Sequence, residues 1–64
     1  MFAWRYLDDI GGELGASGRF LDRDEAERWI GETWQDLAER GVQEVVLMDE
    51  RRGDRVFRMG LDGI

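Results

Sequence analysis

A chain of 64 residues that contains no cysteine must be held together by side-chain packing or by another chain. A domain of this size buries too little surface for an ordinary core to give a wide margin of stability. Disulfides and thiolate metal sites are excluded, and the absence of histidine removes the commonest zinc ligand. We expect one domain over residues 1–64, stabilised by its three tryptophans and three phenylalanines, which bury large areas, or by oligomerisation.

The strongest local pattern predicts a helix from about Arg23 to Arg40. Asp22 is a favourable N-cap residue, and Glu25 three positions later completes a capping-box pattern. Gly41 follows the last turn as the expected C′ residue.

The apolar face of this helix is wide. At about 100° per residue, one stripe is formed by Ala26, Ile30, Thr33 and Leu37. Trp29 and Trp34 flank that stripe on opposite sides, roughly 140° apart. One sheet rarely covers so wide an arc, so we expect one tryptophan at the edge of the core, where it meets a partner. Gly31 lies beyond Trp34 near the polar face, and we hypothesise that it leaves room for a neighbouring chain.

Four shorter segments predict strands. Phe2–Leu7 alternates aromatic residues with others, and Glu13–Ala16 is a weaker candidate for a returning strand because glycines surround it. Val42–Met48 is β-branched and apolar, and turn residues at 49–53 connect it to a last strand at Asp54–Met59. We predict an α+β fold: a mainly antiparallel sheet of three strands, or four, in the order β-(β)-α-β-β, with one helix packed on one face.

The run Val45–Met48 contains four consecutive apolar residues. One helix covers one sheet face, so in a monomer half of them would contact water. We interpret the run as a sign of a second surface covered by another chain, which favours a protein partner or a homodimer. Tryptophan and arginine dominate interface energetics. The candidate partner-binding residues are Trp29, Trp34, Val46, Met48, Arg55 and Arg58.

Four arginines lie in and beside the final hairpin. If the last strand is regular, Arg58 shares a face with Val56, opposite Arg55, Phe57 and Met59. The arginines either bind an acidic partner or pair across the hairpin with Glu44, Asp49 and Glu50.

The net charge of −6 lies entirely in residues 1–48, where eleven acidic residues face five arginines. Phosphate binding needs a basic surface, so we expect no direct nucleic-acid binding. No stretch approaches the length of a membrane span and no signal-peptide pattern is present. We expect a cytoplasmic protein.

The inventory of catalytic groups is short, and we expect no enzyme. Ser17, Thr33 and Tyr6 lack a histidine or lysine to activate them. The glycine-rich segment 11–18 matches no phosphate-binding motif. The acidic residues of segment 22–25 are explained by the helix N-terminus, and Glu27 stands where a calcium-binding loop starting at Asp22 would need glycine. We therefore predict no catalytic residue, no cofactor and no metal ion.

Several short patterns resemble a group of small uncharacterised proteins from high-GC Gram-positive bacteria. They are W-R-Y at 4–6, Phe20, A-E-x-W-I-G-E-x-W at 26–34, G-V at 41–42, V-x-L at 45–47 and M-x-L at 59–61. The present chain departs from the group in having no proline before the helix or before Met59. The resemblance implies a bacterial origin and a compact domain, and no functional residue is carried over from it.

These observations favour a small acidic protein-interaction module, self-associating, that regulates or stabilises a larger protein. Two alternatives remain open. An acidic decoy would compete with nucleic acid for a nucleic-acid-binding protein, and its binding would be sensitive to salt. A small-ligand binder would use a pocket between helix and sheet and would be stabilised by its ligand.

Overall fold

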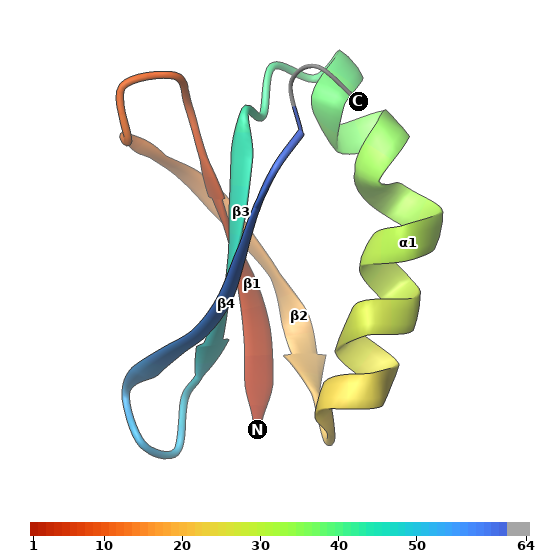
Figure 1. The fold of residues 1–64 in the computed structure, drawn as a ribbon, viewed down its shortest axis with the longest axis vertical. Helices are drawn as coiled ribbons and strands as arrows, with labels where there is room; N and C mark the ends of the chain where they lie inside the picture. The colour runs from red at the N-terminus through yellow and green to blue at the C-terminus, as the bar shows by residue number, and fades with distance from the viewer. Residues whose placement is uncertain (62–64) are drawn as a thin grey trace.

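The computed structural model describes residues 1–61, which form one open four-stranded sheet with one helix on one face (Figure 1). The elements are β1 (Phe2–Leu7), β2 (Glu13–Phe20), α1 (Arg23–Glu39), β3 (Glu44–Asp49) and β4 (Asp54–Gly60). The sheet order is β2-β1-β3-β4, and all neighbours are antiparallel. The predicted α+β fold is confirmed, including the fourth strand and the final hairpin.

Strand β2 is longer than the glycine pattern suggested, because it continues past Ala16 to Phe20. Its register with β1 shifts between Ala3 and Arg5. At this irregularity the Ser17 hydroxyl accepts a hydrogen bond from the Trp4 backbone N–H at 2.8 Å. The side chain thus satisfies a backbone donor that the interrupted ladder leaves without its regular partner.

Helix α1 begins and ends close to the predicted positions. The Asp22 carboxylate accepts a hydrogen bond from the Glu25 N–H at 2.8 Å, so Asp22 is the N-cap. Arg40 is the C-cap residue, and Gly41 follows with a φ of +94°. This left-handed conformation is the one for which a C′ glycine is favoured.

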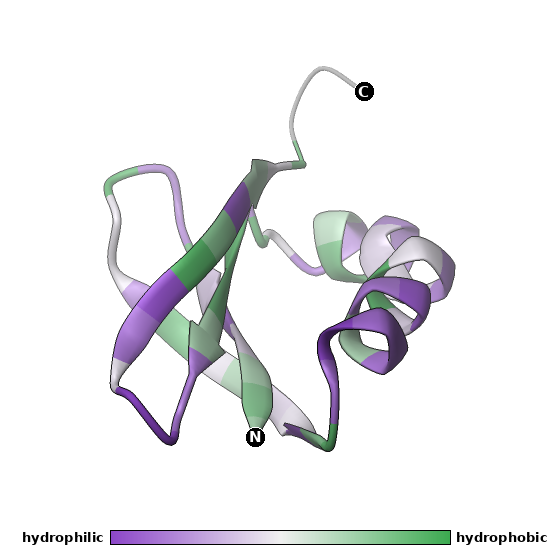
Figure 2. Cartoon of the chain, turned by 60° about the horizontal axis from the view of Figure 1, so that its bottom comes forward, coloured by the Kyte–Doolittle hydropathy of each residue, from purple (hydrophilic) through white to green (hydrophobic). Residues whose placement is uncertain are grey.

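The core lies between α1 and the sheet, and in Figure 2 the hydrophilic residues of α1 lie mostly away from the sheet. Ala26, Ile30 and Leu37 are buried along the predicted helical stripe. Trp4, Val45 and Leu47 meet them from the two central strands with no exposed surface.

The sheet face opposite the helix is covered by its own long side chains. Val46 is only 6% exposed and Ala3 only 7%, although no helix of residues 1–61 lies on that face. The expectation that half of the run Val45–Met48 would contact water is therefore wrong at Val46. Arg5 pairs with Glu13 at 3.7 Å across this face, and the aliphatic stems of such side chains cover apolar neighbours.

The arginines of β4 share one face, contrary to the expectation for a regular strand. Arg58 lies opposite Val46, and Arg55 lies opposite Met48. Val46 and Met48 are two residues apart on β3 and point to the same side. The register shift opposite Leu47/Met48 inserts one extra residue in β4, which brings Arg55 to the face of Arg58.

Candidate functional site

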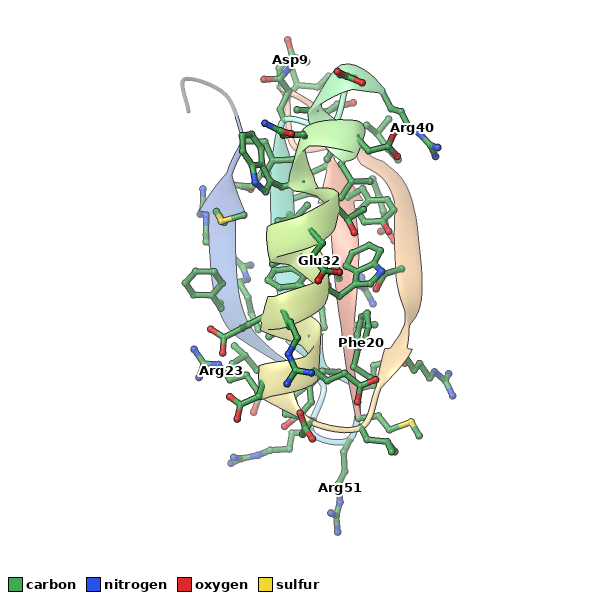
Figure 3. All side chains as sticks on the ribbon, turned by 90° about the vertical axis from the view of Figure 1, so that its right-hand side faces the viewer. Asp9, Phe20, Arg23, Glu32, Arg40 and Arg51 are labelled. Atoms are coloured by element: carbon green, nitrogen blue, oxygen red, sulfur yellow. The ribbon has the colours of Figure 1, made fainter. Side chains whose placement is uncertain are left out.

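Helix α1 is not centred over the sheet. It contacts β1 and β2 more than the other strands, so the β4 side of the same sheet face is less covered. Figure 3 shows α1 in front of the sheet, between β4 on the left and β2 on the right. An open groove of about 410 Å³ lies between α1 and β4. This α1–β4 groove is lined by Trp4, Glu27, Ile30, Gly31, Trp34, Phe57 and Met59.

Three of the seven residues that line the groove are aromatic: Trp4, Trp34 and Phe57. Phe57 meets the Trp4 ring edge-on, with centroids 6.3 Å apart and planes at 80°. The Trp4 indole N–H donates to the Ala26 carbonyl of α1 at 2.9 Å, which fixes the floor of the groove relative to the helix. Phe57 is 38% exposed and Trp34 is partly buried, so both offer apolar surface to an occupant.

Gly31 makes the helical wall of the groove shallow. A Cβ atom at this position would meet no atom within 4 Å among the described residues. The glycine is therefore not required by contacts with the described residues, although it costs about 1 kcal/mol relative to alanine in a helix interior. The space beside it belongs to the groove.

The electrostatic character of the groove comes from α1. Glu27 is the one charged residue among the described residues that line it. Its carboxylate lies 3.8 Å from the Arg23 guanidinium, with both side chains about half exposed, and such solvated pairs are weak. Residues 22–40 carry seven acidic residues and three arginines, so the helix beside the groove has a net negative charge.

The six residues predicted to bind a partner lie in three separate places. Trp34 lines the α1–β4 groove. Trp29 lies on the other flank of the helix, where its ring packs against Phe20 with centroids 5.5 Å apart. The remaining four are on the far face of the sheet: Val46, Met48, Arg55 and Arg58.

Sequence reasoning did not select Phe57, Met59 or Glu27 for the site. Phe57 and Met59 are two residues apart on β4, and they pair with Leu47 and Val45, which are buried on the helix face. That spacing was visible in the sequence. Their exposure beside the helix depends on the sheet order, which no local pattern gives.

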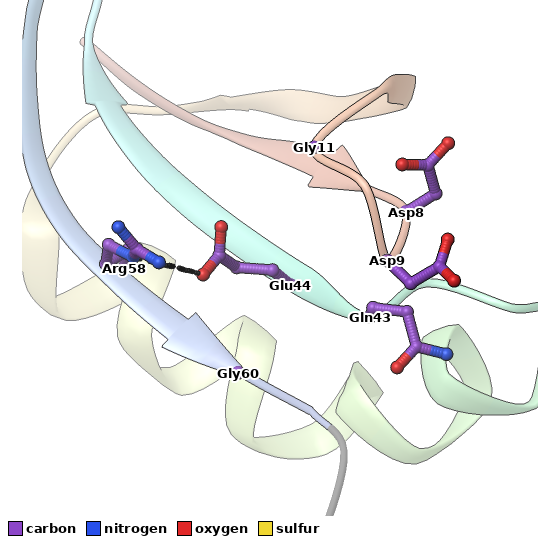
Figure 4. Close-up of a pocket in the computed structure, with 7 residues that line it drawn as sticks. All are labelled: Asp8, Asp9, Gly11, Gln43, Glu44, Arg58 and Gly60. Carbon is purple, nitrogen blue, oxygen red and sulfur yellow. Dashed lines mark hydrogen bonds and ion pairs between the residues drawn. The ribbon is translucent and has the colours of Figure 1, made fainter.

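A second hollow of about 360 Å³ lies at one end of the sheet (Figure 4). Two of its lining carboxylates, those of Asp8 and Glu44, already have protein partners. Asp8 accepts hydrogen bonds from the N–H groups of Ile10 and Gly12, and Glu44 accepts from Arg58 at 2.7 Å. Within residues 1–61 no cluster of acidic side chains is suited to hold a metal ion. The Asp8 carboxylate thus stabilises a turn, and the Glu44 carboxylate stabilises the β3–β4 strand pair.

The fold explains the positions of the three side chains that were considered as nucleophiles. Ser17 bridges the irregular part of β2, since its hydroxyl also donates to the Gly18 carbonyl at 2.8 Å. Thr33 lies on the sheet-facing side of α1 and is partly buried. Burial raises the pKa of the Tyr6 hydroxyl, and the nearby Arg40 guanidinium partly opposes that shift. A raised pKa leaves less of the nucleophilic phenolate at neutral pH.

In the part of the chain that the structure describes, α1 is neither long enough nor apolar enough to cross a membrane.

No protein family, no curated protein and no solved structure gives a significant match to this chain.

Proposed function

We propose that this protein is a small interaction module that binds a larger protein through the α1–β4 groove and thereby regulates or stabilises it. The observation that supports this proposal is the groove itself. Two of its aromatic side chains, Trp34 and Phe57, remain partly exposed beside an open helical glycine. Exposed aromatic side chains are typical anchors of protein interfaces.

Self-association through the far face of the sheet loses its original motivation. That interpretation depended on apolar side chains left in water, and Val46 and Ala3 are already covered within one chain. The α1–β4 groove is therefore the surface on which the proposal depends.

Copurification with matched glycine variants tests the proposal. The tagged wild-type protein is compared in its native host with Gly31→Gln, which places a side chain in the groove. Gly18→Gln is the control, because Gly18 is also exposed and a Cβ there also meets nothing within 4 Å. We expect a partner, identified by mass spectrometry, that is lost in Gly31→Gln and retained in Gly18→Gln. Equal recovery with both variants would contradict the proposal.

The acidity of segment 22–40 favours a second candidate, an acidic decoy for a nucleic-acid-binding protein. Such a partner would be released between about 0.1 and 1 M salt, because screening weakens exposed charge pairs, and DNA or RNA would compete for it. An apolar groove contact would survive the same salt.

The size of the groove favours a third candidate, a small-ligand binder. About 410 Å³ lies within the range of ligand sites. A metabolite at about 100 times its Kd would stabilise the fold by about 2.7 kcal/mol, so a thermal-shift screen would detect it. A hit that is lost in Gly31→Gln would favour this reading over a protein partner.

A further inference from the structure

The α1–β4 groove has two chemical parts. Its floor and sides are apolar, with Trp34 from the helix and Phe57 and Met59 from the edge strand. Its one charged lining residue among those described is Glu27. An occupant that fits both parts has apolar side chains on one face and a cation beside them.

A second acidic side chain lies on the same side of the helix. Asp24 precedes Gly31 by seven residues, so at about 100° per residue the two positions differ by only about 20°. Glu27 is three residues beyond Asp24, on the neighbouring line of the helix surface. Asp24 and Glu27 therefore lie on adjoining lines of α1 beside the N-terminal half of the groove, and Glu27 is also paired with Arg23 at 3.8 Å.

The arginines of β4 do not neutralise these acidic side chains. Arg55 and Arg58 lie opposite Met48 and Val46, on the sheet face away from the helix. Arg58 is also engaged with Glu44 on that face. The helix side of β4 contributes Phe57 and Met59 to the groove.

A second copy of the chain is a poor occupant on grounds of charge. Each copy carries −6, and segment 22–40 holds most of that excess. Seating one α1 in the groove of another would bring two acidic helices together, and such juxtaposition of like charges is costly. A basic partner gains from the same field.

A helix suits the groove better than an added strand. The sheet edge beside the groove is β4, which carries a register shift and two arginines. Bulges and charged side chains are devices that discourage strand addition. A helix instead presents its apolar residues at i, i+3, i+4 and i+7 to a hydrophobic groove.

We propose that the occupant of the α1–β4 groove is a basic amphipathic helix of a partner protein. Its apolar residues contact Trp34, Phe57 and Met59, and a lysine or arginine at its border pairs with Glu27. The cation also lies within reach of the aromatic faces, to which arginine and lysine are attracted. This inference rests on the proposed function and adds the chemistry of the partner.

Two synthetic peptides of about 18 residues, or five helical turns, test the inference. Both have leucine at the spacing of one helix face and lack tryptophan; one has lysine at the polar positions and the other has glutamate. Binding is followed through the tryptophan fluorescence of the protein. We expect saturable binding of the lysine peptide at moderate salt and at least about tenfold weaker binding of the glutamate peptide, an order of magnitude set by charge complementarity.

Two charge-reversal variants locate the binding site. Glu27→Arg changes the groove wall, and Glu32→Arg makes the same change on the outward side of α1, where Figure 3 shows Glu32 pointing away from the sheet. We expect Glu27→Arg to weaken the lysine peptide about tenfold and Glu32→Arg less than about threefold. Equal losses in the two variants would show diffuse charge attraction and overturn the inference.

Gly31→Gln separates failure of the inference from failure of the proposed function. If the wild type binds both peptides equally and this variant weakens both, the groove binds apolar helices without charge selection, so the inference fails and the proposed function stands. If sedimentation shows a dimer of the wild type that Gly31→Gln dissociates, the occupant is a second copy and the inference again fails. If neither peptide binds, the inference is overturned, and the copurification experiment still decides the proposed function. Circular dichroism melting confirms that each variant is folded.

Discussion

Trp4, on β1, contacts three other elements of the structure. Its backbone N–H is satisfied by Ser17 on β2, and its indole N–H is satisfied by Ala26 on α1. Its ring meets Phe57 on β4 and is itself fully buried. A tryptophan here therefore joins the edge strands and the helix, and it sets the depth of the groove because it forms the floor.

Gly31 and Gly41 provide a matched pair of opposite predictions. Gly31→Ala should raise the free energy of unfolding by about 1 kcal/mol, because alanine is the better helix former and its Cβ meets no neighbour. Gly41→Ala should lower it by about 1 kcal/mol, because the φ of +94° is unfavourable for a residue with a Cβ. Urea unfolding of both variants measures the difference. A loss of stability in Gly31→Ala would mean that the glycine is needed inside the fold.

At the scale of the elements, strand β2 depends on one hydroxyl. Ser17→Ala should lower the free energy of unfolding by about 1 kcal/mol, because it leaves the partly buried Trp4 N–H without its acceptor. Ser17→Thr keeps the hydroxyl and is the control. Hydrogen exchange of the Trp4 amide should accelerate in Ser17→Ala. Unchanged protection of that amide would contradict the role assigned to the side chain.

The elements themselves could be predicted from local patterns. The N-cap Asp22, the C′ residue Gly41 and the apolar periodicity between them placed α1 correctly. The alternating aromatic residues placed β1 at Phe2–Leu7. These signals involve neighbours within a few residues, for which propensity and capping are informative.

The arrangement of the elements required longer-range information. The far half of β2 was missed because Ser17 and Gly18 are typical of loops, and its pairing with β1 outweighs that local preference. The sheet face predicted for Arg55 was wrong because one extra residue in β4 shifts the register. The groove depends on β3 and β4 lying on the side of the sheet away from β2, from which α1 begins. Strand order is set by the whole fold.

At the scale of the whole molecule, the charges are separated in space. Segment 22–40, which contains α1, carries seven acidic residues and three arginines. The far face of the sheet instead carries Arg5 and Arg58 in ion pairs with Glu13 and Glu44. The α1–β4 groove borders the acidic side. A basic partner approaching this protein is therefore attracted to the helix side of the fold, where the apolar surface is exposed.

The stability of the whole fold at alkaline pH should depend on one side chain. Of the side chains that titrate between neutral pH and about 12, the chain has no cysteine, no lysine and a single tyrosine, Tyr6. Burial raises the pKa of Tyr6 above its usual value, with the Arg40 guanidinium acting in the opposite direction. Above the usual tyrosine pKa of about 10, the unfolded chain therefore binds fewer protons than the folded protein. The free energy of unfolding must then fall as the pH rises.

Urea unfolding between about pH 8 and 11, a range that spans the usual tyrosine pKa, measures this decline. We expect the wild-type free energy of unfolding to be level until the pH nears the usual tyrosine value and to fall beyond it. Tyr6→Phe should remove this pH dependence of the free energy of unfolding, whatever the stability of the variant at neutral pH, because the substitution removes the titrating group. Arg40→Gln should steepen the slope, because the guanidinium lowers the pKa of Tyr6 and its loss lets burial act unopposed. A wild-type protein that becomes more stable above about pH 10 would mean that the phenolate, and not the neutral hydroxyl, is the form that the fold prefers.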